Sequence, residues 1–318
     1  MNLFLSTPFS YFSKIFLRSA KTLYKATISY YNDDTQTESI QRKAITKKAT
    51  VIIMNIYIMT DLEGISGITS REQVVQDASR YAEGRRLMVN DINVVVRACK
   101  EAGADKVYVR DAHGGGMNVI WSELCEEADG YIIGYTGEDR FPCLEECDAV
   151  ILLGYHAMAG TPGGTLEHSM SSASIQNYWI NGNRAGEVAI DAGIVGDKGK
   201  PVIMVSGDDK VCREAEALLP WVVTAEVKRG ITWKGGILLP QQKAHALLRE
   251  KTIEAIRRAE QENSDVKPLV YDKPITMRVE LVERGILPNK YVKPYMTVID
   301  GRTYEVTGDT MEEVLFRA

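Results

Sequence analysis

The chain has 318 residues, of which 45% are hydrophobic and 25% are charged, with 38 Lys plus Arg against 43 Asp plus Glu. These proportions are ordinary for a soluble globular protein and exclude disordered, collagen-like and fibrous chains. No apolar run reaches the ~18 residues of a membrane-spanning helix, so an integral membrane protein is excluded. The five Cys lack CxxC spacing, and we expect reduced thiols in a cytoplasmic protein.

Charge is unevenly distributed along the chain. Residues 1–53 carry eight basic and three acidic side chains, a net charge of +5, so the other 265 residues carry −10. The first 32 residues contain no acid, which is typical of an organelle transit peptide. The favoured interpretation is a disordered basic extension, or a start site assigned too early with Met54 as the first residue. The acidic remainder makes nucleic acid an unexpected partner.

Strands and helices alternate after Met54. Strands are predicted at residues 55–59, 106–110, 148–153, 177–181, 201–205 and 222–227, and helices at 87–99 and 212–219. A long helix at 241–261 is followed by strands at 275–282, 296–299 and 303–306 and a short helix at 311–317. This order predicts an α/β fold, a mainly parallel sheet flanked by helices, with a smaller C-terminal α+β unit. We expect a metal-binding catalytic domain over 54–240 and a smaller unit over 241–318 that serves oligomerisation.

Chemically reactive side chains follow three of these strands. Asp61 and Glu63 follow the first, His113 follows the second, and His156 follows the buried strand at 148–153. Parallel strands bind ligands beyond their carboxyl ends, so these groups are expected to converge. Two carboxylates at i and i+2 face one side and repel unless a cation or proton lies between them. Imidazole with carboxylate suits zinc, with manganese or cobalt as alternatives.

Two further residues are weaker candidates. His168 follows a glycine-rich segment at 160–164, where a loop could present an acid/base group. Glu187 by residue type alone is a solvated carboxylate at the start of a helix. By contrast, His245 lies inside a helical run and is interpreted as structural. The segment 206–209 is interpreted first as a helix cap.

Several segments together resemble the zinc-dependent D-aminopeptidase family of the bacterial dipeptide-transport operon. They are residues 54–67, 111–113, 153–157, 167–170 and 185–187. The resemblance implies a catalytic role for His168 and a ring-shaped homo-oligomer, a decamer in the known case. It also implies two zinc ions per subunit, Asp61 bridging them, with the ligands Asp61, Glu63, His113, His156 and Glu187.

The predicted function is a metal-dependent aminopeptidase that removes the N-terminal residue from short peptides. Two alternatives stay open at this point. One is another two-metal hydrolase, a phosphoesterase or an amidase, for which Arg110 and Arg184 are candidate phosphate-binding groups. The other is a non-enzymatic metal-binding protein of peptide uptake. The preference for D- or L-residues, the substrate and the identity of the metal are also left open by the sequence.

Overall fold

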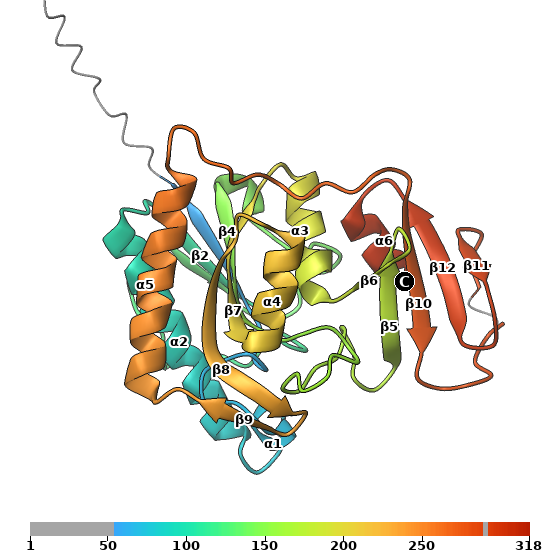
Figure 1. The fold of residues 1–318 in the computed structure, drawn as a ribbon, viewed down its shortest axis with the longest axis horizontal. Coiled ribbons are helices and arrows are strands. Elements are labelled where there is room, and N and C mark those ends of the chain that lie inside the picture. Colours follow the sequence, from blue (N-terminus) through green and yellow to red (C-terminus); the bar gives the residue numbers. More distant parts are fainter. Residues whose placement is uncertain (1–53, 289–291) are drawn as a thin grey trace, which may run out of the picture. The chain divides into compact units, whose positions relative to one another are not determined.

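The computed structural model describes residues 54–288 and 292–318, so the predictions for residues 1–53 lie outside the described residues. Its framework is two β-sheets with helices packed against them (Figure 1). The first sheet has seven strands in the order β3-β2-β1-β4-β7-β8-β9. Their bounds are β1 Ile56–Thr60, β2 Val107–Asp111, β3 Gly130–Ile132, β4 Ala149–Tyr155, β7 Val202–Asp208, β8 Val223–Thr232 and β9 Gly235–Leu238.

The strand order of this sheet reverses between β1 and β4. The chain runs from β1 outward to β2 and β3, then returns to β4 on the other side of β1 and continues to β7 and β8. All of these neighbours pair in parallel, and β9 alone adds antiparallel to β8. Such a reversal leaves a crevice at the carboxyl ends of the two central strands, which is where ligands bind in open α/β sheets.

Helices cover both faces of the first sheet. Side chains alternate along β1, so Ile56 and Ile58 join one buried cluster with α2 (Tyr81–Ala102) and α5 (Gln241–Ala259). Tyr57 and Met59 join the cluster on the opposite face, with α3 (Glu187–Asp197) and α4 (Asp209–Leu218). Because both faces are covered, β1 and β4 are buried along their whole length, which explains their uninterrupted apolar sequence.

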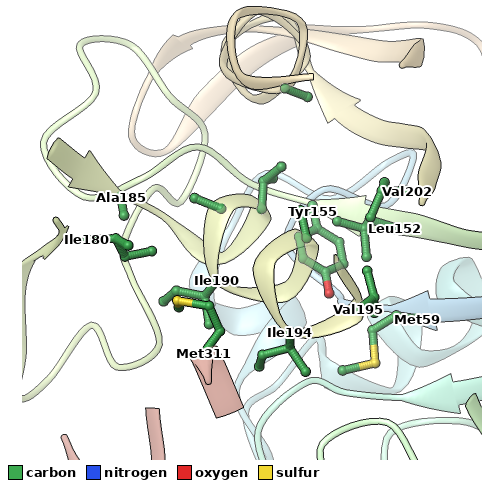
Figure 2. Close-up of a cluster of buried hydrophobic side chains, with 14 of the residues drawn as sticks. Met59, Leu152, Tyr155, Ile180, Ala185, Ile190, Ile194, Val195, Val202 and Met311 are labelled. Atoms are coloured by element: carbon green, nitrogen blue, oxygen red, sulfur yellow. The ribbon is translucent and has the colours of Figure 1, made fainter. Parts of the chain in front are cut away.

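The second sheet is antiparallel, in the order β11-β12-β10-β5-β6. Its bounds are β5 Ile175–Ile180, β6 Asn183–Ala185, β10 Ile275–Leu281, β11 Met296–Val298 and β12 Thr303–Gly308, followed by α6 Met311–Arg317. Strands β5 and β6 form a hairpin whose Asn181 and Gly182 have φ of 48° and 82°. Positive φ at two successive residues, here Asn followed by Gly, is typical of a tight hairpin turn. Figure 2 shows Ile180 and Met311 beside Ile190 and Ile194 of α3, which therefore shares its core with both sheets.

The predicted fold class is confirmed: a mostly parallel sheet flanked by helices, with a separate antiparallel sheet in the C-terminal region. The proposed division near residue 240 stays a prediction. In the described residues, β5 and β6 pair with the tail strand β10, and α5 packs against α2 and β8. The described helices include none long and apolar enough to cross a membrane.

Some elements were absent from the sequence prediction. They are α1 (Arg71–Val74), β3, β6, β9 and two short 3₁₀ helices at Trp121–Glu123 and Leu144–Glu146. Helix α3 was considered only as a helix start at Glu187 and its extent was not predicted, because nearly all of its residues are buried and no polar face gives a helical period. The expected cap at the start of α4 is confirmed, since the Asp208 carboxylate accepts from the amides of Lys210 and Val211.

Candidate metal centre

The loop after β1 crosses directly over the end of β4. The Asp61 amide donates to the Leu153 carbonyl at 2.8 Å, and the Gly64 amide donates to the Gly154 carbonyl at 2.7 Å. A Cβ at Gly64 would lie 1.9 Å from the Tyr155 carbonyl oxygen, so only glycine fits there. This close approach brings the two carboxylates of the loop to the crevice between β1 and β4.

A buried lysine on β8 holds the same loop by hydrogen bonds to its backbone. The Lys228 ammonium, on β8, donates to the carbonyl oxygens of Glu63, Ile65 and Ile68 at 2.6, 3.0 and 2.7 Å. Its side chain is buried, and burial lowers the pKa of Lys228 to about 8. One side chain therefore supplies all three of its donors to the backbone that follows Asp61.

Three histidine rings face these carboxylates, and each is oriented by the same kind of hydrogen bond. Each donates one ring N–H to a backbone carbonyl: His113 Nε2 to Val74 at 2.8 Å, His156 Nδ1 to Ala157 at 3.0 Å and His168 Nδ1 to Leu166 at 2.9 Å. The other ring nitrogen of each is thereby aimed into the site. Metal-binding histidines are commonly held by such a bond from their second nitrogen.

The inward nitrogens lie close to carboxylate oxygens. His113 Nδ1 is 3.1 Å from Asp61 Oδ1 and 3.0 Å from Glu63 Oε2. His156 Nε2 is 3.4 Å from Asp61 Oδ2 and 3.2 Å from Glu187 Oε1. The two oxygens of Asp61 therefore face different histidines, as a bridging carboxylate does.

Glu187 reaches the centre from the first turn of α3. The hairpin β5–β6 directs the chain into this helix, and the Glu187 side chain is only 10% exposed. Its Oε1 accepts the Met170 amide at 2.7 Å and lies 3.9 Å from His168 Nε2. The interpretation as a solvated helix-start carboxylate is therefore wrong, because the second sheet turns this residue inward.

His168 is presented by a loop with unusual backbone geometry. Its ring stacks on that of His156, with centroids 4.0 Å apart and planes tilted by 11°. Leu166 and Met170, on either side, have φ of 55° and 60°, which costs a non-glycine residue about 1–3 kcal/mol. Trp233 clamps the loop, accepting from the Leu166 amide at 2.9 Å and donating to the carbonyl of Glu167 at 3.1 Å.

The electrostatics of the cluster depend on the balance between burial and opposite charge. Burial alone raises the pKa of Glu187, but the facing His156 outweighs it and lowers that pKa to about 2. Burial would lower the pKa of His156, yet Glu187 and Asp61 raise it to about 10. Burial and the neighbouring Glu63 raise the pKa of Asp61. Without a metal, protons on His113 and His156, whose pKa values are raised, compensate the carboxylates.

A metal ion fits this arrangement better than protons do. Among the described residues, Asp61 Oδ2, Glu63 Oε2 and His156 Nε2 are buried and make no hydrogen bond. Two groups have their ligand atoms within 4.8 Å of one another: Asp61, Glu63 and His156, and His156, His168 and Glu187. Buried polar atoms without partners are costly, and oxygen and imidazole donors suit zinc. His113 belongs to neither group, but its Nδ1 faces the first.

Five of the six side chains, all except His156, line a cleft of about 320 Å³. Its walls also contain residues that the sequence analysis missed, namely Arg71, Val74 and Val75 at α1, Arg140, Leu166, Met170 and Trp233. The α1 segment could have been found, because Ser70 and Gln73 form a capping box. Arg140 and Trp233 carry no such local signal, since the fold alone brings them to the cleft.

The structure brings all six predicted site residues together, and their roles stay predictions. The arginines considered for phosphate are engaged elsewhere. Arg110 donates to Thr136 Oγ1 at 2.7 Å, and Arg184 donates to Asn177 and to the Ala159 carbonyl. His245, interpreted as structural, lies on α5 with Nε2 3.3 Å from Asp91 Oδ1, outside the cleft.

Comparison with known proteins places this geometry in a family. Residues 54–317 match the model of peptidase family M55, described as D-aminopeptidase. A D-aminopeptidase of Bacillus subtilis strain 168 is 34% identical over 258 residues, which cover 77% of this chain and 90% of the relative.

A solved structure supports the same family assignment. The Zn-dependent D-aminopeptidase DppA from Bacillus subtilis, described as a self-compartmentalizing protease, superposes with a TM-score of 0.76 and 31% identity. The match covers 82% of this chain and 94% of that one. The chain therefore belongs to the D-aminopeptidase family.

Proposed function

We propose that this protein is a zinc-dependent D-aminopeptidase that removes the N-terminal residue from short peptides. The observation that carries the proposal is the convergence of three carboxylates with three imidazoles, each of which turns one nitrogen toward them. Membership of the D-aminopeptidase family supports this assignment over that of a phosphoesterase, an amidase or a non-enzymatic binding protein.

The proposed zinc ligands are Asp61, Glu63, His113, His156 and Glu187. Two ions per subunit agree with these five ligands, and Asp61 would be suited to bridge them because its oxygens face different histidines. Manganese or cobalt would accept the same ligands. Zinc in such a centre would polarise the scissile carbonyl and make attack by water feasible at neutral pH.

His168 is the proposed proton carrier. Its Nδ1 is fixed by the Leu166 carbonyl, which leaves Nε2 directed toward Glu187 and the cleft. A group so placed can deliver a proton to the departing amine. Val74, Leu166 and Trp233 add apolar surface to the cleft in which this proton transfer would take place.

Metal analysis together with a substrate panel tests this function. The zinc-loaded protein is expected to hydrolyse D-alanyl-D-alanine faster than its L,L counterpart and to leave p-nitrophenyl phosphate intact. Replacing His168 by Ala should lower kcat by about 100- to 10,000-fold at unchanged zinc content. Loss of zinc from that variant would make His168 a ligand, and preferential hydrolysis of the phosphate ester would overturn the peptidase assignment.

We further propose a cytoplasmic homo-oligomer, with a decameric ring as the specific arrangement. The support is the self-compartmentalizing character stated for the structural relative DppA. Sedimentation of the purified protein measures the assembly: a mass near ten subunits is expected, and a monomer at micromolar concentration would refute it.

A further inference from the structure

The cleft lining contains side chains of both charges. It includes the carboxylates of Asp61, Glu63 and Glu187 and two arginines, Arg71 and Arg140. A peptide whose scissile bond lies at the metal centre carries a carboxylate at its other end. The acidic groups would repel that carboxylate, so an available cation elsewhere in the cleft decides where it binds.

Arg140 is already committed to an internal partner. Its Nε and Nη2 both donate to the Asp191 carboxylate, the second at 2.9 Å, and its side chain is 14% exposed. Asp191 also accepts the Tyr155 hydroxyl at 2.6 Å. This bidentate pair supports α3 beneath Glu187 and leaves Arg140 little capacity for a ligand.

Arg71 differs from Arg140 in the contacts of its guanidinium group. Within residues 54–288 and 292–318 its guanidinium makes neither a hydrogen bond nor an ion pair, and the residue is exposed. A guanidinium presents parallel N–H donors that match a carboxylate, and it stays charged at any physiological pH. An unpaired arginine on the wall of an acidic cleft is therefore suited to a ligand with an anionic end.

The backbone beneath Arg71 is fixed to the metal centre. Val74, three residues along α1, accepts the N–H of the proposed ligand His113 at 2.8 Å. The Gln73 side chain accepts the amides of Thr69 and Ser70 at 3.0 and 3.1 Å. The backbone of Arg71 is consequently held close to the site of cleavage, and its exposed side chain can reach the far end of a short peptide only.

We propose that Arg71 binds the free C-terminal carboxylate of the peptide and so restricts the enzyme to very short substrates. The inference rests on the proposed function and adds the substrate class, di- and tripeptides with an unblocked C-terminus. The cleft volume of about 320 Å³ is consistent with this class, being at the low end of the ~300–1,000 Å³ range of small-molecule sites.

The test compares D-alanyl-D-alanine with its C-terminal amide on zinc-loaded protein. In Arg71→Ala, kcat/KM for the free acid should fall about 10- to 100-fold, the range for a lost charged hydrogen bond, and that for the amide should not change. Arg71→Lys should recover part of the loss. Arg80→Ala is the control, because Arg80 is exposed and pairs with Glu83 at 2.8 Å away from the cleft lining.

Equal losses for the acid and the amide, or no loss for either, would overturn the role of Arg71. Calorimetric titration with both compounds separates this role from the peptidase activity. Tighter binding of the acid than of the amide, lost in Arg71→Ala, without turnover in wild type would remove the peptidase proposal and keep the carboxylate site. Equal binding of both compounds would remove the carboxylate site.

Discussion

Each donor that the first sheet contributes lies just beyond the carboxyl end of a parallel strand, whereas the second sheet contributes only the hairpin that leads into Glu187. The reason is geometric. Parallel strands all end at one edge and can surround a small ion, but antiparallel strands alternate in direction and spread their ends over two edges. The first sheet thus supplies most of the proposed metal ligands, and the second sheet mainly supports the position of Glu187.

The largest effect is expected where the first sheet carries the proposed zinc ligands. Replacing Asp61 by Asn should lower zinc affinity and kcat/KM by more than about 100-fold, because even the loss of outer partners costs ~10- to 100-fold. Zinc titration followed by activity assay measures it. The metal-free variant should be at least as stable as wild type, because the substitution relieves the repulsion from Glu63 that helps raise the Asp61 pKa. A variant that binds zinc normally would exclude Asp61 from the ligand set.

Substitutions in the second sheet are expected to lower stability and to leave zinc affinity unchanged. Met277, on β10, is fully buried, and its replacement by Ala should reduce the free energy of unfolding by about 2–5 kcal/mol. Denaturant unfolding gives this value, and zinc affinity below the transition should match wild type. A folded variant with weakened zinc binding would show that the second sheet does more than support.

Replacing Lys228 tests whether a residue that is not a proposed ligand positions the carboxylate loop of the first sheet. Lys228→Met keeps most of the volume but removes the ammonium that three loop carbonyls share, so the carboxylate loop should loosen and zinc affinity fall about 10- to 100-fold. Lys106→Met is the matched control, since Lys106 makes an exposed pair with Glu146. Equal zinc affinities in the two variants would refute a positioning role.

The smallest effect is expected at the hairpin turn. Gly182 has φ of 82°, so Gly182→Ala should cost about 1–2 kcal/mol of stability. Activity at saturating zinc should stay within about twofold of wild type, because the strain is local to the turn and the Met170 amide holds Glu187 in addition to the hairpin. Thermal unfolding and kcat measure the two quantities, and a large loss of activity would mean that strain at the turn reaches Glu187.

Much of the first sheet was predictable because its signals are local. Buried strands such as β4 are continuous apolar runs, and α2 has a helical period and ends at Gly103 with φ of 106°. The clustering of Asp61, His113 and His156 followed from one rule about strand ends. Such information is contained within a few neighbouring residues.

The remainder depends on contacts between distant segments. Glu187 resembles a surface carboxylate until the hairpin turns it inward, and Lys228 resembles an ordinary strand residue until the loop after β1 surrounds its ammonium group. Arg71 lies more than 100 residues before Trp233, yet both line one cleft. No local sequence pattern shows that these residues lie close together, so the residues lining the cleft could be identified only from the structure.

The left-handed backbone at Leu166 and Met170 has a kinetic consequence. The loop between them is already bent into the shape that brings His168 to Glu187, with Trp233 holding it there. If His168 is the proton carrier, as proposed, it is in place beforehand and needs no closing motion before the first proton transfer. We therefore expect product formation in a single turnover to begin without a lag, at a rate insensitive to solvent viscosity.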